Sequence, residues 1–248
     1  MNDSACFPQE APALRVQCGV GREELAAAYE LVYRSYRDRG YVFPHQGGVV
    51  YQPTFGLPSS RTLIAASPSR EAVGTLSIVG DNPWGFEAET TFPDEVRALR
   101  RQGRRLAELT CLAIEPVGEF EPRCVFFALT KFMIHYVTWR GYDELLLAIH
   151  PRHYRFYWRF FRAYPLGPTR PHSFANDNPA LPCAIDLRTL RQNGDPELFR
   201  RYFARPVPVE AFLRPAMRPE DHCYFCRRSG AEFIPDVDAP PPRAREAA

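Results

Sequence analysis

Lysine is nearly absent from this chain of 248 residues: Lys131 is the only one among 31 basic residues. We attribute this imbalance mainly to genomic codon bias, although arginine also makes forked contacts with carboxylates and phosphates. Net charge is low as well, at +2. Bulk charge therefore gives no argument for a protein that binds nucleic acid or a membrane surface.

Long apolar runs are also missing, and none approaches the roughly 20 residues that a membrane-spanning helix needs. The N-terminus, MNDSACFPQE, has neither the charged start nor the apolar centre of a secretory signal. The seven cysteines are odd in number and irregularly spaced, which favours free thiols in a reducing compartment. We therefore expect a cytoplasmic protein with no stable membrane insertion.

The chain does contain an alternation of apolar strand patterns and amphipathic helix patterns. Hydrophobic residues make up 45% of it, which is enough for a substantial core. Strands are predicted at 13–20, 61–66, 72–80, 106–114, 144–149, 171–176 and 180–187. Helices are predicted at 22–40, 90–103, 122–141, 196–205 and in the segment that starts at Pro151.

This order of elements favours an α/β fold, in which helices flank a mixed sheet on both faces. The strands at 61–66 and 72–80 are joined by a short turn-like segment and should form an antiparallel hairpin. After residue 186 the chain turns polar and rich in proline, and its last residues have the composition of a disordered tail. We predict one α/β domain at 1–190 and a C-terminal extension of helices and loops at 191–248.

Glu108 is the most informative single residue, because it lies in the otherwise apolar strand LAELTCLAI. A carboxylate there costs on the order of several kcal/mol unless it is hydrogen-bonded, paired or used in chemistry. Burial would raise its pKa toward the range of a useful general base. The alternative is a structural carboxylate that points outward or pairs with Arg104 or Arg105.

A second unusual segment is HPRHYRFYWRFFRAY at 150–164, which gathers rings and arginines where a strand gives way to a helix. At helical spacing Tyr154, Tyr157 and Phe161 share one stripe, and the arginines occupy the complementary stripe. The rings are either the core side of a helix that covers the sheet or the wall of an active site.

Three regions carry a family resemblance: AAAYELVYRSYRDRGY at 26–41, LRRQGRRLAELTCLAI at 99–114, and HPRHYRFYWRFF at 150–161 followed by FANDNPALPCAIDL at 174–187. Together they resemble the long-chain N-acyl amino acid synthases, a branch of the GNAT acyltransferase fold related to the acyl-homoserine lactone synthases. The resemblance implies an enzyme that moves a fatty acyl chain from an acyl carrier protein to the amine of an amino acid. It implies no cofactor beyond the phosphopantetheine that arrives on the carrier protein.

Acyl transfer of this kind requires a base for the amine, donors for an oxyanion and an acid for the leaving thiolate. The resemblance implies that Glu108 is the base, because Glu-Leu-Thr is similar to the Glu-x-Ser motif of the lactone synthases. It implies that Tyr157 is the acid, a role that His150 or His153 could share. A phenol with an ordinary pKa near 10 is able to donate a proton at neutral pH.

Binding roles follow from the same resemblance and from charge. The residues expected to contact the acyl chain and pantetheine are Thr110, Cys111, Leu112 and Tyr154. Tyr36 and Arg104 are expected to contact the acceptor amino acid. Carrier proteins are acidic, so we expect them to dock on a basic surface formed by Arg152, Arg155 and Arg159. A second arginine group, formed by Arg97, Arg100, Arg101, Arg104 and Arg105, is an alternative docking surface.

The loop after the strand at 106–114 departs from the pattern of members that use coenzyme A. Those members have an Arg/Gln-x-x-Gly-x-Gly/Ala loop, whose backbone N–H groups hold the pyrophosphate. Here EPVGEFEPRCVFF has Gly118 but no second glycine, and Glu119 and Glu121 would repel a phosphate. The departure favours a carrier protein as the acyl donor.

Two other functions remain open from sequence. An acyl-homoserine lactone synthase is the nearer one, but those enzymes have an arginine on the first helix where this chain has Val32. The other is a non-catalytic module that keeps a pocket for a lipid or a carrier protein. HCYFC at 222–226 offers three possible zinc ligands without a second pair, so we predict no metal site and expect the segment to cover the acyl pocket instead.

Overall fold

The computed structural model describes residues 14–68, 72–115 and 120–233. Eight strands form a mixed sheet in the order β1-β2-β3-β4-β5-β8-β6, with β7 paired to β8. The strands are β1 Arg15–Cys18, β2 Arg61–Ala66, β3 Ala72–Gly80, β4 Leu106–Ile114, β5 Glu144–Ile149, β6 Tyr164–Pro165, β7 Arg170–His172 and β8 Asn178–Asp186. Within the described ranges β4 and β5 are the only parallel pair.

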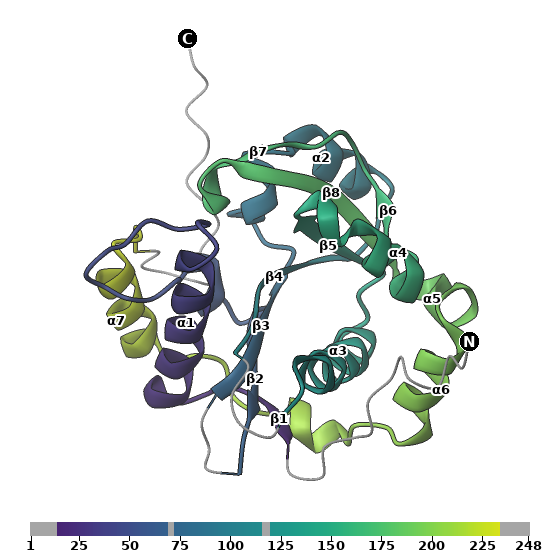
Figure 1. Cartoon of the computed structure of the whole chain (residues 1–248), viewed down its shortest axis with the longest axis horizontal. Helices are drawn as coiled ribbons and strands as arrows, with labels where there is room; N and C mark the ends of the chain where they lie inside the picture. Colours follow the sequence, from purple (N-terminus) through teal and green to yellow (C-terminus); the bar gives the residue numbers. More distant parts are fainter. Residues whose placement is uncertain (1–13, 69–71, 116–119, 234–248) are drawn as a thin grey trace.

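Helices cover both faces of this sheet, as predicted (Figure 1). They are α1 Arg22–Arg37, α2 Pro93–Arg101, α3 Pro122–Trp139, α4 Tyr154–Phe161, α5 Leu187–Asn193, α6 Pro196–Ala204 and α7 Pro219–Ser229. One core, which includes Tyr29 and Phe225, joins α1, α2 and α7 to one face. A second core, which includes Leu129 and Phe161, joins α3, α4, α5 and α6 to the other face.

The central position of β4 explains its apolar sequence. Successive side chains of a strand point to opposite faces, so Leu106 joins the core under α1 while Ala107 and Leu109 join the core under α3. A strand buried on both faces needs apolar residues at nearly every position. This is the setting that makes Glu108 exceptional.

Most predicted elements are confirmed, including the β2–β3 hairpin and the helix that begins at Pro122. The segment predicted as a strand at 171–176 is mainly different: β7 ends at His172 and a 3₁₀ helix, η5 Ser173–Ala175, follows. Asn176 and Asp177 then adopt left-handed conformations, with φ of +53° and +57°, which turn the chain back into β8.

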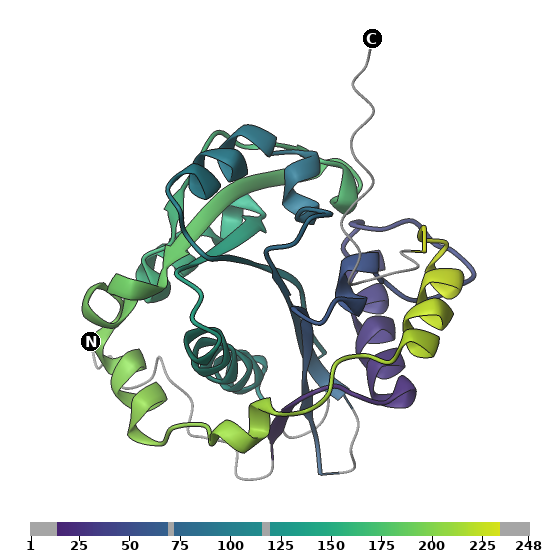
Figure 2. The same ribbon diagram turned by 180° about the vertical axis from the view of Figure 1, so that it is seen from behind.

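The C-terminal extension wraps around the molecule rather than forming a separate lobe (Figures 1 and 2). The helix α6 packs on α3, where the ring nitrogen Nε2 of His135 lies 3.0 Å from the carbonyl oxygen of Tyr202. The chain then passes to the opposite face, and α7 lies beside α1, with Arg22 paired to the buried Asp221 at 2.7 Å. The predicted boundary between residues 190 and 191 falls inside α5, and the tail predicted to be disordered lies outside the described residues.

Candidate active site

The sheet opens between its two parallel strands. Residues 106–109 of β4 pair with 144–147 of β5. Beyond Leu109, β4 still pairs with β3, but its other edge has no strand partner in the described part of the chain. A cavity of about 550 Å³, which we call the active-site cavity, lies at this opening.

A β-bulge in β4 borders the active-site cavity. Cys111 and Leu112 both oppose the single residue Leu76 of β3, and Cys111 has a φ of +52°. Such a bulge bends the strand and redirects its side chains and backbone groups. Thr110, Cys111 and Leu112, the predicted acyl and pantetheine contacts, all line the cavity.

The active-site cavity has an apolar part and a polar part, on opposite sides of the sheet opening. Its apolar lining comes mainly from the α3 side: Phe126, Met133, Leu147, Ile149, Phe161 and Ile185. Its polar lining includes Tyr36, Arg39, Tyr41, Glu87, Glu108 and His172. A ligand with a long apolar chain and a polar end therefore matches the two halves of the lining.

Glu108 lies at the junction of the two parts and is 2% exposed. Its carboxylate accepts N–H bonds from Glu87 at 3.0 Å and Ala88 at 2.9 Å, the first residues of the 3₁₀ helix η3 Glu87–Thr90. Burial, together with the charge of Glu87, raises the pKa of Glu108 to about 8, although the two N–H bonds oppose the shift. The carboxylate therefore does not pair with Arg104 or Arg105, which was the structural alternative.

Glu87 and His172 were not identified from sequence, yet both line the active-site cavity. The His172 ring, nearly buried, has Nε2 2.9 Å from the Glu87 carboxylate and Nδ1 2.7 Å from the Thr91 hydroxyl. Glu108 accepts the backbone N–H of Glu87, and the side chain of Glu87 contacts His172, so the three residues form one connected group. The three residues come from separate elements, so no sequence spacing connects them, although a histidine inside a predicted strand was a visible signal.

Tyr36 and Tyr157 face the cavity from α1 and α4. Burial raises the pKa of Tyr157 to about 12, and it raises that of Tyr36 well above its ordinary value, with further contributions from Cys111 and Tyr157. Both phenols are therefore neutral proton donors at physiological pH. Tyr157 also contacts the rings of Phe126 and Phe161. Its side chain therefore belongs both to the wall of the cavity and to the packed core, the two interpretations given for the segment 150–164.

A cluster of basic residues lies at the cavity on the β5–α4 connection. Arg152 donates to the Tyr41 hydroxyl at 2.9 Å and to Nε2 of His153 at 3.1 Å. His150 accepts the backbone N–H of Arg152 and so caps the 3₁₀ helix η4 Pro151–His153. Burial and then the Arg152 charge lower the pKa of both histidines. All three basic side chains line the cavity, and Arg152 is also exposed to solvent.

Four other predicted site residues lie outside the cavity lining. Arg104 pairs instead with Asp186 at 3.4 Å and with Glu144 at 3.7 Å, so its guanidinium is not turned toward an acceptor at this site. Tyr154 packs against the core under α3. Arg155 and Arg159 are exposed on α4.

The cysteines of the site region and of HCYFC show no nucleophile or metal arrangement. Burial raises the pKa of Cys111 to about 12, which keeps its thiol neutral. HCYFC lies in α7, where the His222 ring bonds the Tyr51 hydroxyl at 2.6 Å, beside α1 and away from the acyl side of the cavity. The expectation that this segment covers the acyl pocket is therefore wrong. In the described ranges no group of three or more potential ligands is placed to hold a metal.

Most of the acidic loop that replaces the glycine loop is not described, since Gly118 and Glu119 fall outside the described residues. Glu121 immediately precedes α3. Among the described helices, none combines the length and apolar character that a membrane span requires.

Solved structures share this fold at low sequence identity. FeeM, an N-acyl amino acid synthase from uncultured soil microbes, is 21% identical with a TM-score of 0.65, over 77% of this chain and 100% of that chain. The acyl-homoserine lactone synthase LasI is 13% identical with a TM-score of 0.55, over 73% and 94%. The coenzyme-A-dependent lactone synthase BjaI is 12% identical with a TM-score of 0.56, over 86% and 98%. These likenesses confirm the predicted GNAT-like fold.

A search among curated proteins found no match. A family model, by contrast, matches residues 27–186, which is more than half of the chain, and describes the N-acyl amino acid synthase FeeM. The matched range contains β4, the sheet opening and every residue of the Glu108–Glu87–His172 group. The chain therefore belongs to the FeeM family of N-acyl amino acid synthases and is an N-acyltransferase.

Proposed function

We propose that this enzyme transfers a long acyl chain from the thioester of an acyl carrier protein to the amine of an amino acid. The observation that carries the proposal is a cavity that passes through the sheet opening, with Glu108 at the junction of its apolar and polar parts. The thioester carbonyl lies at that junction, the acyl chain lies on the α3 side, and the amino acid enters from the α1 side.

The acyl chain packs against the apolar lining, which includes Phe126, Met133 and Phe161. The thioester carbonyl lies along the edge of β4 that has no strand partner among the described residues beyond Leu109. Backbone N–H groups on such an edge are fixed donors, and donors of this kind stabilise a developing oxyanion. The bulge at Cys111 brings this edge toward the cavity.

Glu108 removes a proton from the acceptor ammonium, directly or through the adjacent Glu87–His172 pair. A pKa of about 8 suits this task, because it approaches that of an amine while leaving part of the carboxyl ionised at neutral pH. The amine nitrogen then bonds to the carbonyl carbon, and the carbon–sulfur bond breaks. Tyr157 gives its phenolic proton to the departing thiolate, and the second proton that the nitrogen loses on becoming an amide restores the phenol.

The acceptor carboxylate binds the cationic groups on the polar side. Arg39 and Arg152 both line the cavity there, and Arg152 is fixed by its bond to Tyr41. A guanidinium presents a planar fork that fits a carboxylate. Arg39 and Arg152 thus take the place that Arg104 was expected to fill.

A carrier protein is the preferred donor, and it docks on α4. Arg155 and Arg159 are exposed there, next to the cavity wall that holds Tyr157. The fold is also found in BjaI, described as coenzyme-A-dependent, so the argument rests on these arginines and on the acidic loop and not on the fold. A lactone synthase is disfavoured because Val32 is 1% exposed within the core and offers no cation to a second substrate.

The proposal is tested first by mass spectrometry of lipid extracts from cells that express the protein, where N-acyl amino acids should accumulate. Purified enzyme should then show a higher kcat/KM with acyl carrier protein than with the same acyl chain on coenzyme A. That preference should decrease steeply with salt, since charges about 10 Å apart are screened at 0.1 M.

Reversing two charges identifies the docking surface. We expect the double variant Arg155→Glu/Arg159→Glu to lose at least tenfold in kcat/KM with the carrier protein and to retain activity on a small pantetheine thioester. Arg227→Glu, exposed on α7 beside α1, is the matched control. Loss in Arg97→Glu/Arg101→Glu instead would move the docking surface to α2, and equal activity with acyl-coenzyme A would contradict a carrier-protein donor.

A further inference from the structure

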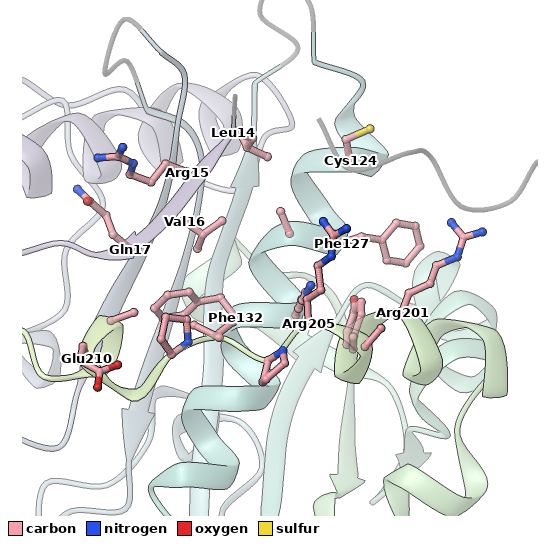
Figure 3. Close-up of a pocket in the computed structure, with 18 of the residues that line it drawn as sticks. Leu14, Arg15, Val16, Gln17, Cys124, Phe127, Phe132, Arg201, Arg205 and Glu210 are labelled. Carbon is pink, nitrogen blue, oxygen red and sulfur yellow. The ribbon is translucent and has the colours of Figure 1, made fainter. Parts of the chain in front are cut away.

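Two sides of α3 face two different cavities. Thr130 and Met133 line the active-site cavity, whereas Phe127 lines a second cavity, as helical periodicity requires. Figure 3 shows this second cavity, with Phe127 of α3 and Arg201 of α6 among the residues around it. The helix α3 therefore separates the acyl part of the active-site cavity from the C-terminal extension.

The direction of α3 identifies the deep end of the acyl part. Because β4 and β5 are parallel, the helix that connects them runs in the opposite direction to both strands. Phe126 therefore lies near the open end of the strand pair, and Thr130 and Met133 lie about one and two turns further in. Leu147 also lines the cavity, and it pairs with Leu109 where the two strands come together. The acyl part thus ends among Thr130, Met133 and Leu147.

Tyr202 of α6 lies directly behind Thr130. Its hydroxyl oxygen is 2.5 Å from the Thr130 hydroxyl, which in turn is 2.8 Å from the carbonyl oxygen of Phe126. When Tyr202 donates to Thr130 and Thr130 donates to Phe126, both hydroxyls are satisfied within the wall. Thr130 and Tyr202 are 4% and 3% exposed, and Tyr202 also lines the second cavity. One hydrogen-bonded pair therefore separates the two cavities at this point.

Further contacts fix the position of Tyr202. Its ring centroid lies 6.0 Å from that of Phe199, one turn earlier in α6, and its carbonyl oxygen lies 3.0 Å from Nε2 of His135 on α3. Packed side chains in a protein interior move little, so the ring is a fixed obstacle. The side chain comes from the C-terminal extension, outside the residues 27–186 that match the family model.

We propose that Tyr202 closes the deep end of the acyl part and limits the length of the acyl chain that the enzyme accepts. It acts through Thr130, against which the methyl end of the chain packs, so Tyr202 is a positioning residue and takes no part in the chemistry. The inference rests on the function proposed above, because it takes the acyl part as the place of the acyl chain. It assigns the C-terminal extension a role in substrate specificity.

Chain-length profiles test this role. Pantetheine thioesters from octanoyl to hexadecanoyl are compared by kcat/KM in the parent and in Tyr202→Ala. The parent should show a length beyond which kcat/KM decreases, and the variant should accept the next longer even-numbered chain. Burial of one methylene contributes about a fourfold factor, so kcat/KM for that chain should increase by up to about fifteenfold. An unchanged optimum in folded Tyr202→Ala would overturn the proposal.

Two other variants of α6 separate the length effect from a loss of packing. Tyr202→Phe keeps the ring and loses only the hydroxyl, so it should show the parental optimum. Phe203→Ala is the matched control, because Phe203 contacts the ring of His135 from the same helix but lines neither cavity in the described part of the chain. It should also show the parental optimum. An equal shift in Phe203→Ala would mean that any loosening of α6 lengthens the pocket, which contradicts a specific role for Tyr202.

A photoreactive probe locates the end of the chain in the parent protein, without substitution and without turnover. The probe is a pantetheine thioether, which has no carbonyl and is not transferred, and it bears a diazirine at the end of the longest alkyl chain that binds by titration calorimetry. After irradiation, peptide mass spectrometry should find the label on Thr130, Met133 or Tyr202. Label on the α1 side of the sheet, at Tyr36 or Arg39, would overturn the proposal whether or not Tyr202→Ala folds.

The two measurements distinguish a failure of this inference from a failure of the proposed function. Label at the deep end, with no acyl transfer from any thioester, would overturn the proposed function and retain the role of Tyr202. Acyl transfer by the parent with label elsewhere, or with an optimum that Tyr202→Ala leaves unchanged, would overturn the role of Tyr202 and retain the proposed function.

Discussion

Two buried glutamates on neighbouring strands have opposite surroundings. Glu108 on β4 is 2% exposed and Glu144 on β5 is 0% exposed. Their strands run parallel and pair directly, but Glu144 begins β5 at the closed end of the pair, whereas Glu108 lies near the opening. Burial disfavours the ionised form of both carboxylates, and the two differ in the groups that compensate this cost.

Glu144 is compensated by fixed polar groups. The Tyr164 hydroxyl donates to it and Arg104 lies 3.7 Å away, in an ion cluster that also includes Asp186. Burial still raises the pKa of Glu144, against the lowering effects of Tyr164 and Arg104. None of the four residues of this cluster lines the active-site cavity. This carboxylate therefore serves the structure.

Glu108 has no cationic partner among the described residues, and the charge that raises its pKa most is that of another carboxylate, Glu87. Backbone N–H groups hold its position without neutralising it. A buried carboxylate that faces a cavity and keeps a pKa of about 8 is prepared to exchange protons. Burial alone therefore does not distinguish a catalytic glutamate from a structural one, and the partners do.

The largest expected effect separates the two glutamates directly. Glu108→Gln should lower turnover by about 10²–10⁴-fold, the range for a lost general base, whereas Glu144→Gln should retain turnover per folded molecule. Both variants should unfold at lower temperature. In Glu108→Gln the new amide nitrogen would face a backbone N–H where an oxygen now accepts it, which costs about 1–3 kcal/mol. Turnover must be measured where both variants are folded, and equal losses in the two would erase the distinction.

A second substitution tests the acid on the opposite side of the cavity. Tyr157→Phe removes the phenolic hydroxyl and should lower turnover by about 10²-fold while retaining the ring contacts. Tyr154→Phe, on the same helix but outside the cavity lining, should change little. Should Tyr157→Phe keep full activity and unfold at lower temperature, its hydroxyl is structural and the thiolate takes its proton from His150, His153 or water.

A third variant tests whether Arg104 stabilises the cluster around Glu144. Arg104→Leu leaves Glu144 and Asp186 without their shared cation, so the free energy of unfolding should decrease by about 2–4 kcal/mol. Urea denaturation measures this loss, and kinetics on the folded fraction should show an unchanged KM for the amino acid. A KM raised tenfold or more with no loss of stability would return Arg104 to the acceptor role.

A dependence of stability on pH tests the raised pKa of Glu108. Between pH 4.5 and about 8 the folded protein retains a proton on Glu108 that the unfolded chain releases, because the folded-state pKa is the higher one. The free energy of unfolding should therefore decrease as pH rises through this window, by at most about 1.4 kcal/mol per unit, and level off above it. Glu108→Gln should lack this slope in urea titrations, and identical slopes in variant and parent would mean that Glu108 is ionised throughout.

Much of the fold was predictable because it depends on local patterns. The apolar periodicity of β4 and α3, proline at helix starts and glycine after helix ends act over a few residues. The short helix α7 was missed although it begins at Pro219 and ends before Gly230, because its polar sequence hides the buried Asp221 and Phe225. That helix is held by distant partners such as Arg22, which no local pattern contains.

The sequence by itself determined that Glu108 is costly to bury and that Tyr157 lies on a ring-lined helix face, because each statement needs only its neighbours along the chain. Only the tertiary structure decided what those residues meet: Glu87 and His172 lie beside Glu108, and Arg152 is among the residues that line the cavity. It also decided that Arg104 serves Glu144 instead of a substrate. The strength of an electrostatic interaction depends on the distance between two groups in space. Two residues that lie dozens of positions apart in the chain form no periodic sequence pattern from which their contact could be predicted.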